Sequence, residues 1–124
     1  MSSITQSLED YLESIYMLVE AKHPAQVCNV AQMLSVKMPS VVKAMRELKR
    51  LDLVVQEPYG DIKLTTKGRR LARHIMSRHT LLRTFLLNLG VSQRIADRDA
   101  CRMEHILSAE TLDRIRSYNT KNKK

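Results

Sequence analysis

Residues 27–51, VCNVAQMLSVKMPSVVKAMRELKRL, hold the pattern that decides the fold. The apolar spacing predicts a short helix over 27–34, a tight connection over 35–38 and another helix from Pro39 to about Leu51. Proline suits the first turn of a helix, because its missing N–H would have no partner there. The apolar residues of the later helix predict a buried stripe made of Val41, Val42, Met45, Leu48 and Leu51.

The flanking sequence adds a helix before this segment and a hairpin after it. Residues 7–21 predict an amphipathic helix, with Ser7 as the expected N-cap. Two short apolar runs, 53–56 and 62–64, enclose a Pro/Gly turn and predict a β-hairpin. Further helices are expected over about 65–90, 92–107 and 110–117. The polar tail from 119 to 124 is expected to fray.

The order of these elements predicts the fold class. Helix, short helix, proline-started helix and hairpin follow one another as in a winged helix-turn-helix, whose third helix enters the major groove of DNA. We therefore expect a mainly α protein. A winged-helix domain with a small β-hairpin wing is expected over 1–68, and a second, helical domain with a basic tail over 69–124.

The charge balance favours an anionic partner. Twenty-one Lys and Arg against 13 Asp and Glu give a net charge of +8. An excess of this size often marks a nucleic-acid-binding protein. The segment 62–96 carries eight basic residues and no acidic one. The alternative is a helical bundle whose solvated face happens to be basic.

The third predicted helix offers side chains for two kinds of DNA contact. Base edges in the major groove are reached from the N-terminal turns of such a helix. Those turns carry Lys37, Pro39, Ser40 and Lys43. The residues further along that can neutralise phosphates are Arg46, Lys49 and Arg50. Tyr59, at the tip of the hairpin, is placed to meet phosphate or sugar.

A second group of residues has the spacing of metal ligands. Cys101, Glu104 and His105 stand at i, i+3 and i+4, so one face of one predicted helix presents S, O and N donors. The preceding predicted helix adds His79, and the first adds Asp10 and Glu13 at i and i+3. Each residue alone also fits a structural role, such as a core histidine or a buried thiol. For the whole cluster the alternative is a structural zinc site.

Several segments together resemble one known family. They are 9–18 (EDYLESIYML), 39–41 (PSV), 64–68 (LTTKG), 78–82 (RHTLL) and 100–108 (ACRMEHILS). They resemble, in order and over nearly the whole chain, the diphtheria-toxin-repressor family, which includes the manganese transport regulators. The resemblance implies a homodimeric, metal-activated transcriptional regulator that binds pseudo-palindromic operator DNA and represses metal-uptake genes. It also implies that the segment 69–124 is a metal-binding and dimerisation domain.

The family's ligand positions fall on the six candidate residues named above. Asp10 and Glu13 resemble the manganese branch of the family, whereas Cys101 resembles the iron branch. The implied cofactor is therefore Mn(II) or Fe(II). Arg83 and Asp97 stand where the iron branch has a glutamate and a histidine of an ancillary site, which makes such a site doubtful here.

Other classes fit the sequence less well. A Cys and His pair could serve an enzyme as nucleophile and base, but no Gly-rich phosphate loop or nucleophile elbow accompanies it, so we expect no enzyme. No apolar run approaches the roughly 20 residues of a membrane helix, and Cys28 and Cys101 suit reduced thiols. We expect a cytoplasmic protein with Cys28 in the core. A winged-helix regulator that ignores metal remains the alternative.

Overall fold

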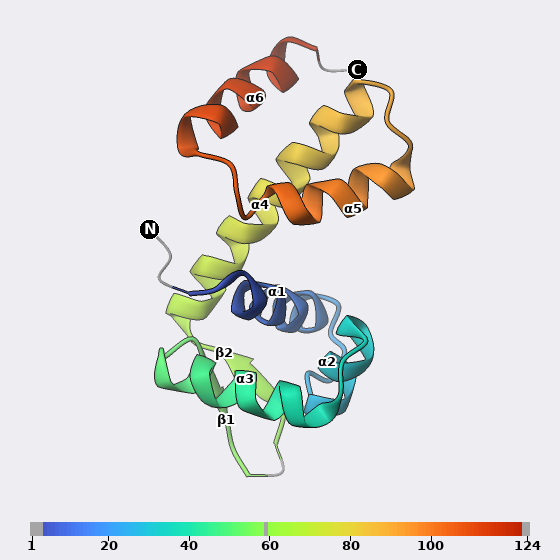
Figure 1. The fold of residues 1–124 in the computed structure, drawn as a ribbon. Coiled ribbons are helices and arrows are strands. Elements are labelled where there is room, and N and C mark those ends of the chain that lie inside the picture. Colours follow the sequence, from blue (N-terminus) through green and yellow to red (C-terminus); the bar gives the residue numbers. More distant parts are fainter. Residues whose placement is uncertain (1–3, 59, 123–124) are drawn as a thin grey trace. The chain divides into compact units, whose positions relative to one another are not determined.

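The computed structural model describes residues 4–58 and 60–122. The helices are α1 (Gln6–Glu20), α2 (Val27–Leu34), α3 (Met38–Arg50), α4 (Thr66–Asn88), α5 (Gln93–Met103) and α6 (Ala109–Lys121), and the strands are β1 (Val54–Gln56) and β2 (Ile62–Leu64) (Figure 1). Contacts between Cα atoms divide the chain into two compact units, Met1–Arg73 and His74–Lys124, and the division falls within α4. The mainly α fold with a single hairpin, predicted from the sequence, is confirmed for the described residues.

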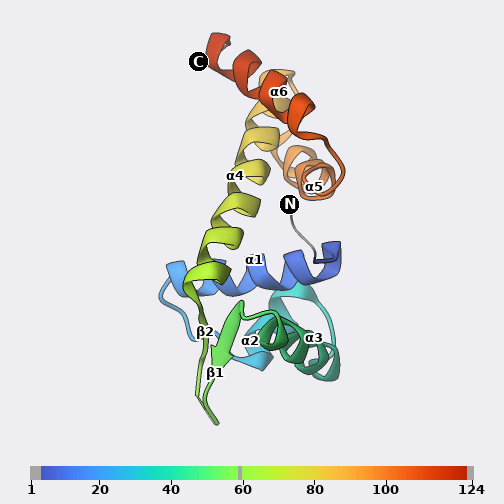
Figure 2. The same ribbon diagram turned by 90° about the vertical axis from the view of Figure 1, so that its left-hand side faces the viewer.

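The first unit is built around the helix-turn-helix. Helix α1 packs against α2, α3 and β2 (Figures 1 and 2). Its apolar face contributes Leu12 and Ile15, which are fully buried with Leu48 of α3. Between α2 and α3, Ser35 takes a left-handed backbone conformation with φ of 55°. That conformation ends α2, and Pro39 lies in the first turn of α3.

The wing is fastened at both of its ends. Strands β1 and β2 are antiparallel, with Val54 opposite Leu64. The N–H of Ile62 donates to the carbonyl of Ala25 at 2.7 Å, which ties β2 to the segment before α2. After β2, Gly68 lies so close to the chain that a Cβ there would be 1.9 Å from the Leu53 carbonyl oxygen. Only glycine fits this approach, so the start of α4 rests directly on the end of the α3–β1 turn.

The second unit is a small helical cluster. Its core consists of Leu82, Leu86, Ala96, Ala100, Leu112 and Ile115. The two alanines are fully buried, and their small side chains let α5 lie close to α4. Helix α4 ends at Asn88, and Gly90 follows in a turn with a φ of 97°. The N–H of Val91 bonds back to the Leu86 carbonyl at 3.0 Å. This turn sends α5 back along α4. Among the described helices, none combines the length and the apolar character needed to cross a membrane.

Three expectations about helix ends are wrong. The N-cap of α1 is Thr5, whose hydroxyl accepts from the N–H of Leu8 at 3.2 Å, and not Ser7. Helix α5 ends at Met103, because the chain tightens there: the N–H of Ile106 bonds to the carbonyl three residues back. Helix α6 continues to Lys121 instead of ending near 117, and the Asn119 amide donates to the Leu81 carbonyl of α4 at 3.0 Å.

Two expectations about burial are also wrong. Val42 is 45% exposed, because it lies at the edge of the buried stripe, about 100° around the helix from Val41. Cys28 is exposed. It occupies the first turn of α2, whose buried residues are Val30 and Ala31. Both errors came from treating an apolar residue as a core residue without fixing its angular position on the helix.

Candidate metal centre and nucleic-acid interface

Helix α3 separates a buried face from an exposed, basic one. Its buried residues are Val41, Ala44, Met45 and Leu48. The residues predicted to contact DNA are all exposed: Lys37, Pro39, Ser40, Lys43, Arg46, Lys49 and Arg50. Their arrangement on one solvent-facing side is the geometry that a recognition helix needs. Tyr59, the predicted contact of the wing, lies outside the described residues.

The exposed side of α3 also carries two apolar residues, Met38 and Val42, that the sequence did not assign to the DNA-binding face. Met38 is 51% and Val42 is 45% exposed. With Pro39, Lys43 and Arg46 they line a shallow groove on the helix surface. An apolar side chain among basic ones suits DNA, because the major groove presents the thymine methyl group beside polar base edges. The i, i+4 spacing of 38, 42 and 46 could have assigned them to the exposed row.

One basic residue of this face is paired within the helix. Arg50 Nε donates to Glu47 Oε1 at 3.0 Å, and the two residues form an ion pair at i, i+3. The hydrogen bond from Arg50 lowers the pKa of the Glu47 carboxyl below its usual range. Glu47 therefore stays ionised at neutral pH and offsets part of the charge that Arg50 presents to a phosphate.

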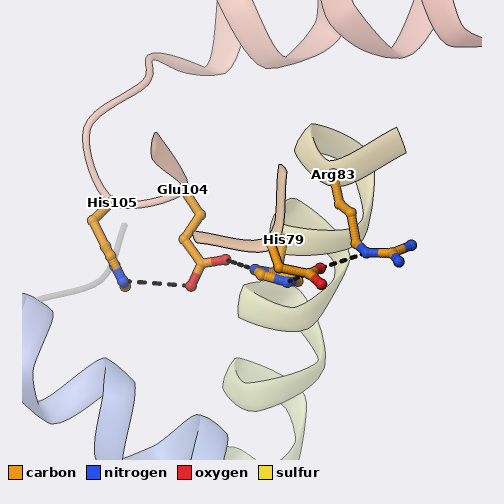
Figure 3. Close-up of polar contacts among 5 residues, drawn as sticks. His79, Arg83, Glu104 and His105 are labelled. Carbon is orange, nitrogen blue, oxygen red and sulfur yellow. Dashed lines mark hydrogen bonds and ion pairs between the residues drawn. The ribbon is translucent and has the colours of Figure 1, made fainter. Parts of the chain in front are cut away.

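In the second unit, a buried carboxylate lies between two imidazoles. Glu104, which caps the C-terminal end of α5, is 1% exposed. Its Oε2 is 3.2 Å from Nδ1 of His79 on α4, and its Oε1 is 3.4 Å from Nε2 of His105 (Figure 3). Cys101 lies one turn earlier on α5, with its Sγ within 4.8 Å of a Glu104 carboxylate oxygen. Four predicted ligands therefore converge in this unit.

The donor set of this cluster fits a divalent cation. Neither carboxylate oxygen of Glu104 accepts a hydrogen bond from the described residues. A buried carboxylate without donors is costly unless a positive charge compensates it. A metal ion would supply that charge, and imidazole, carboxylate and thiolate are ligands of first-row divalent metals. His79, Cys101, Glu104 and His105 are the residues of this unit that would hold such an ion.

The remaining predicted ligands belong to the first unit. Asp10 and Glu13 lie on α1, one turn apart, so their side chains leave the same side of the helix. The expectation that His105 shares a helix face with Cys101 and Glu104 is wrong, because α5 ends at Met103. His105 lies in the turn that follows, yet its imidazole still reaches Glu104.

Two family models match this chain, one toward each end of the sequence. The model described as the iron dependent repressor, N-terminal DNA binding domain, matches residues 3–62. The model described as the iron dependent repressor, metal binding and dimerisation domain, matches residues 65–124. The HTH-type transcriptional regulator MntR of Geobacillus kaustophilus is 42% identical over 111 residues, which are 90% of this chain and 79% of that protein.

The chain belongs to the iron-dependent repressor family. A second relative of this repressor, an uncharacterised HTH-type transcriptional regulator of Methanocaldococcus jannaschii, is 38% identical over 95% of the chain and 96% of its own length. Among solved structures, the manganese regulator SloR matches with a TM-score of 0.82 and 30% identity over 94% of the chain. IdeR of T. acidophilum matches with a TM-score of 0.82 and 27% identity over 97% of the chain.

The repressor spans about 55% of the length of the SloR chain and 56% of the IdeR chain. The family match confirms the predicted metal-dependent, DNA-binding transcriptional regulator with a dimerisation domain. The family's members are transcriptional regulators and not enzymes. The predicted cofactor, Mn(II) or Fe(II), is confirmed as a choice between these two metals. The family description names iron, and one solved structure is a manganese-dependent repressor.

Proposed function

We propose that this repressor binds Mn(II) or Fe(II) and, in that state, binds operator DNA as a homodimer to repress metal-uptake genes. The observation that carries the proposal is the buried Glu104 carboxylate, flanked by two imidazoles and without hydrogen-bond donors among the described residues. The proposed ligands are Asp10, Glu13, His79, Cys101, Glu104 and His105.

The ligand chemistry supports either ion. Carboxylates favour Mn(II), whereas the Cys101 thiolate and the imidazoles favour later metals. The solved manganese regulator SloR and a solved manganese-dependent repressor support manganese, and the family description supports iron. Since affinity alone rises from Mn(II) toward Cu(II), the choice in the cell depends on the geometry of the site and on metal supply.

The metal is proposed to act by joining the two units of the chain. Without a cation, Asp10 and Glu13 on α1 would repel the buried Glu104 on approach. A divalent ion neutralises these carboxylates and lets ligands from both units bind together. Because α1 packs against α2 and α3, fixing α1 also fixes the recognition helix. A metal that binds the DNA-competent arrangement more tightly shifts the population toward it.

The DNA contacts follow from the exposed face of α3. The proposed base-reading residues are Lys37, Pro39, Ser40 and Lys43, and the proposed phosphate contacts are Arg46, Lys49, Arg50 and, from the wing, Tyr59. The functional boundary is proposed after Gly68, where the winged helix meets the helical metal-binding domain. A two-fold dimer would place two copies of α3 on half-sites of a pseudo-palindrome, about one helical turn apart.

The test begins with DNA fragments selected from a random library by the full chain in the presence of Mn(II). Binding of the selected fragment is then measured anaerobically against Mn(II) and Fe(II). We expect either ion to tighten DNA binding and, by linkage, the fragment to tighten ion binding by the same factor. The Glu104→Gln variant is the control and should show no response. DNA affinity that ignores both ions would instead establish a metal-independent winged-helix regulator.

A structural zinc site is the second candidate, because the Cys101 thiol accompanies two imidazoles at Glu104. Structural zinc stabilises the fold itself, so its removal unfolds a small domain. Circular dichroism of the full chain with and without a chelator separates the two functions. We expect the helical signal to persist after chelation, and its loss would favour structural zinc.

A further inference from the structure

An ion pair lies beside the metal-binding cluster, on the side of His79 that faces away from Glu104. Arg83 Nε donates to Asp97 Oδ1 at 2.5 Å, and the same oxygen is 4.0 Å from Nε2 of His79 (Figure 3). His79 and Arg83 are four residues apart on α4 and share a face. Asp97 comes from the second turn of α5, which the neighbouring Ala96 and Ala100 hold close to α4.

The imidazole of His79 therefore has a carboxylate at each ring nitrogen. Its Nδ1 is 3.2 Å from Glu104 Oε2, and its Nε2 faces Asp97. A neutral imidazole carries one N–H and one lone pair, and a metal ligand must direct the lone pair at the ion. If the ion lies at Glu104, Nδ1 must hold the lone pair. The proton is then on Nε2, which lies 4.0 Å from Asp97 Oδ1. An approach of about 1 Å would bring the carboxylate within hydrogen-bond distance of this N–H.

Arg83 fixes the carboxylate that would accept this proton. Its hydrogen bond holds Asp97 Oδ1 in place, and its positive charge neutralises Asp97 without engaging Glu104. Both side chains are only partly exposed, 32% for Arg83 and 47% for Asp97.

We propose that Asp97, held by Arg83, is a positioning residue for His79. On closing from 4.0 Å it accepts a hydrogen bond from the Nε2–H. It thereby selects the tautomer whose Nδ1 lone pair points toward Glu104, and so raises the affinity of the site for its divalent ion. The proposal rests on the proposed metal-binding function. It assigns a role to two residues outside the six proposed ligands.

The first experiment compares variants of the full chain by anaerobic calorimetric titration with Mn(II). Asp97→Ala should weaken Mn(II) binding by about 10- to 100-fold, the usual effect of removing an outer partner of a histidine ligand. Asp97→Asn should recover part of the affinity, because an amide oxygen can still accept a hydrogen bond from Nε2–H. Arg83→Gln should lie between Asp97→Asn and the unmodified chain.

The matched control is Asp99→Ala. Asp99 lies on the same helix and pairs with Arg98 at 3.6 Å, also on the surface. Its removal should leave Mn(II) affinity within about twofold. The metal-free Tm of Asp97→Ala and Asp99→Ala should be similar, which separates a loss of positioning from a loss of fold. Equal Mn(II) affinity of Asp97→Ala and the unmodified chain would overturn the positioning role while leaving the proposed function intact.

The second experiment observes the tautomer itself. Zn(II) is diamagnetic, so the full chain with ¹⁵N-labelled histidine and Zn(II) allows the protonated ring nitrogen of His79 to be assigned by NMR. We expect the proton on Nε2 and the metal on Nδ1. A proton on Nδ1 would overturn the proposal directly. If the unmodified chain bound neither ion, the proposed function would fail and the positioning role with it.

Discussion

The recognition face of α3 and the Glu104 cluster place their functional groups in opposite environments. On α3 every predicted DNA contact is exposed on a regular helix. Such charges are already solvated in the free protein. Each therefore adds a small, separate amount to the DNA-binding free energy, and that amount falls as salt is added. Glu104 is 1% exposed, at a helix end, with two imidazoles close by. In a buried site, the free-energy contribution of each polar group depends on the presence of its neighbours. The cluster should therefore tolerate substitution far less than the face that reads DNA.

Replacing Glu104 gives the largest expected effect. Glu104→Gln keeps the side-chain size and removes the charge, so Mn(II) affinity should fall by more than about 100-fold, beyond the effect of an outer partner. The metal-free protein should remain folded, with a Tm that is unchanged or higher, because a buried charge is removed. Calorimetric titration and thermal melts check both results. Glu110→Gln, on the exposed first turn of α6, is the control. A loss of fold in Glu104→Gln would make the buried carboxylate structural.

Cys101→Glu tests whether the thiol takes part in the cluster. A carboxylate in place of the thiolate should shift the ratio of affinities toward Mn(II) and away from later metals by about tenfold. Competition between Mn(II) and Zn(II), followed by calorimetry, measures that ratio. Cys28→Ser provides the control, since Cys28 is exposed at the start of α2. An unchanged ratio in Cys101→Glu would mean that Cys101 packs and does not bind the ion.

The same contrast explains how far the sequence could predict this molecule. Helices with a full apolar stripe, such as α3, were located to within a residue or two, because the buried row repeats over several turns. Val42 was misplaced because an exposed apolar residue on a DNA-reading helix has the composition of a core residue. Only its angular position, at the edge of the buried stripe and in the exposed i, i+4 row with Met38 and Arg46, reveals the difference.

The cluster shows what the sequence could not provide. Spacing identified Cys101 and Glu104 as neighbours, and the structure brings them together. It could not locate the end of α5, since no glycine or proline marks Met103 and the chain ends the helix by a tightened turn. The pairing of Asp97 with Arg83 depends on how α5 returns along α4, which local pattern does not encode.

Two lysines of the recognition face should contribute to DNA binding in different ways. Lys43→Ala, near the N-terminal turns, should weaken binding to the selected DNA by about 1 kcal/mol, roughly fivefold, and reduce the preference over random DNA. Lys49→Ala, further along the helix, should weaken binding to both DNAs alike and lower the salt slope by about one. Fluorescence anisotropy over a salt series measures both. Equal effects of Lys43→Ala on both DNAs would assign Lys43 to the backbone.

Val42 should make a smaller contribution to the DNA-binding free energy, and one that does not depend on charge. If its exposed methyl groups meet a thymine methyl, Val42→Ala should weaken specific binding by roughly 0.8 kcal/mol, about fourfold, with no change in salt slope. Replacing thymines of the selected fragment one at a time by deoxyuridine should show the same loss at one position. In the Val42→Ala variant, replacing thymine by deoxyuridine at that position should no longer change the affinity. Insensitivity at every position in the unmodified chain would remove Val42 from the reading face.

Glu47→Gln should have the smallest effect, and in the opposite direction. Removing the carboxylate releases Arg50 for phosphate, so binding to any DNA should strengthen by about twofold, with a steeper salt slope. The hydrogen bond from Arg50 lowers the Glu47 pKa, so the pair persists above the usual carboxyl range and is lost only as pH falls through the lowered value. The increase in DNA affinity caused by Glu47→Gln should therefore be constant between about pH 6 and 8.

The matched control for Glu47→Gln is Asp113→Asn on α6. It also breaks an i, i+3 ion pair, with Arg116 at 2.6 Å, and changes the net charge by the same amount. If net charge alone controlled DNA binding, the two variants would strengthen it equally. A gain confined to Glu47→Gln shows that the position of the charge on α3 decides the effect. This is what solvated, separately acting contacts require, in contrast to the shared site at Glu104.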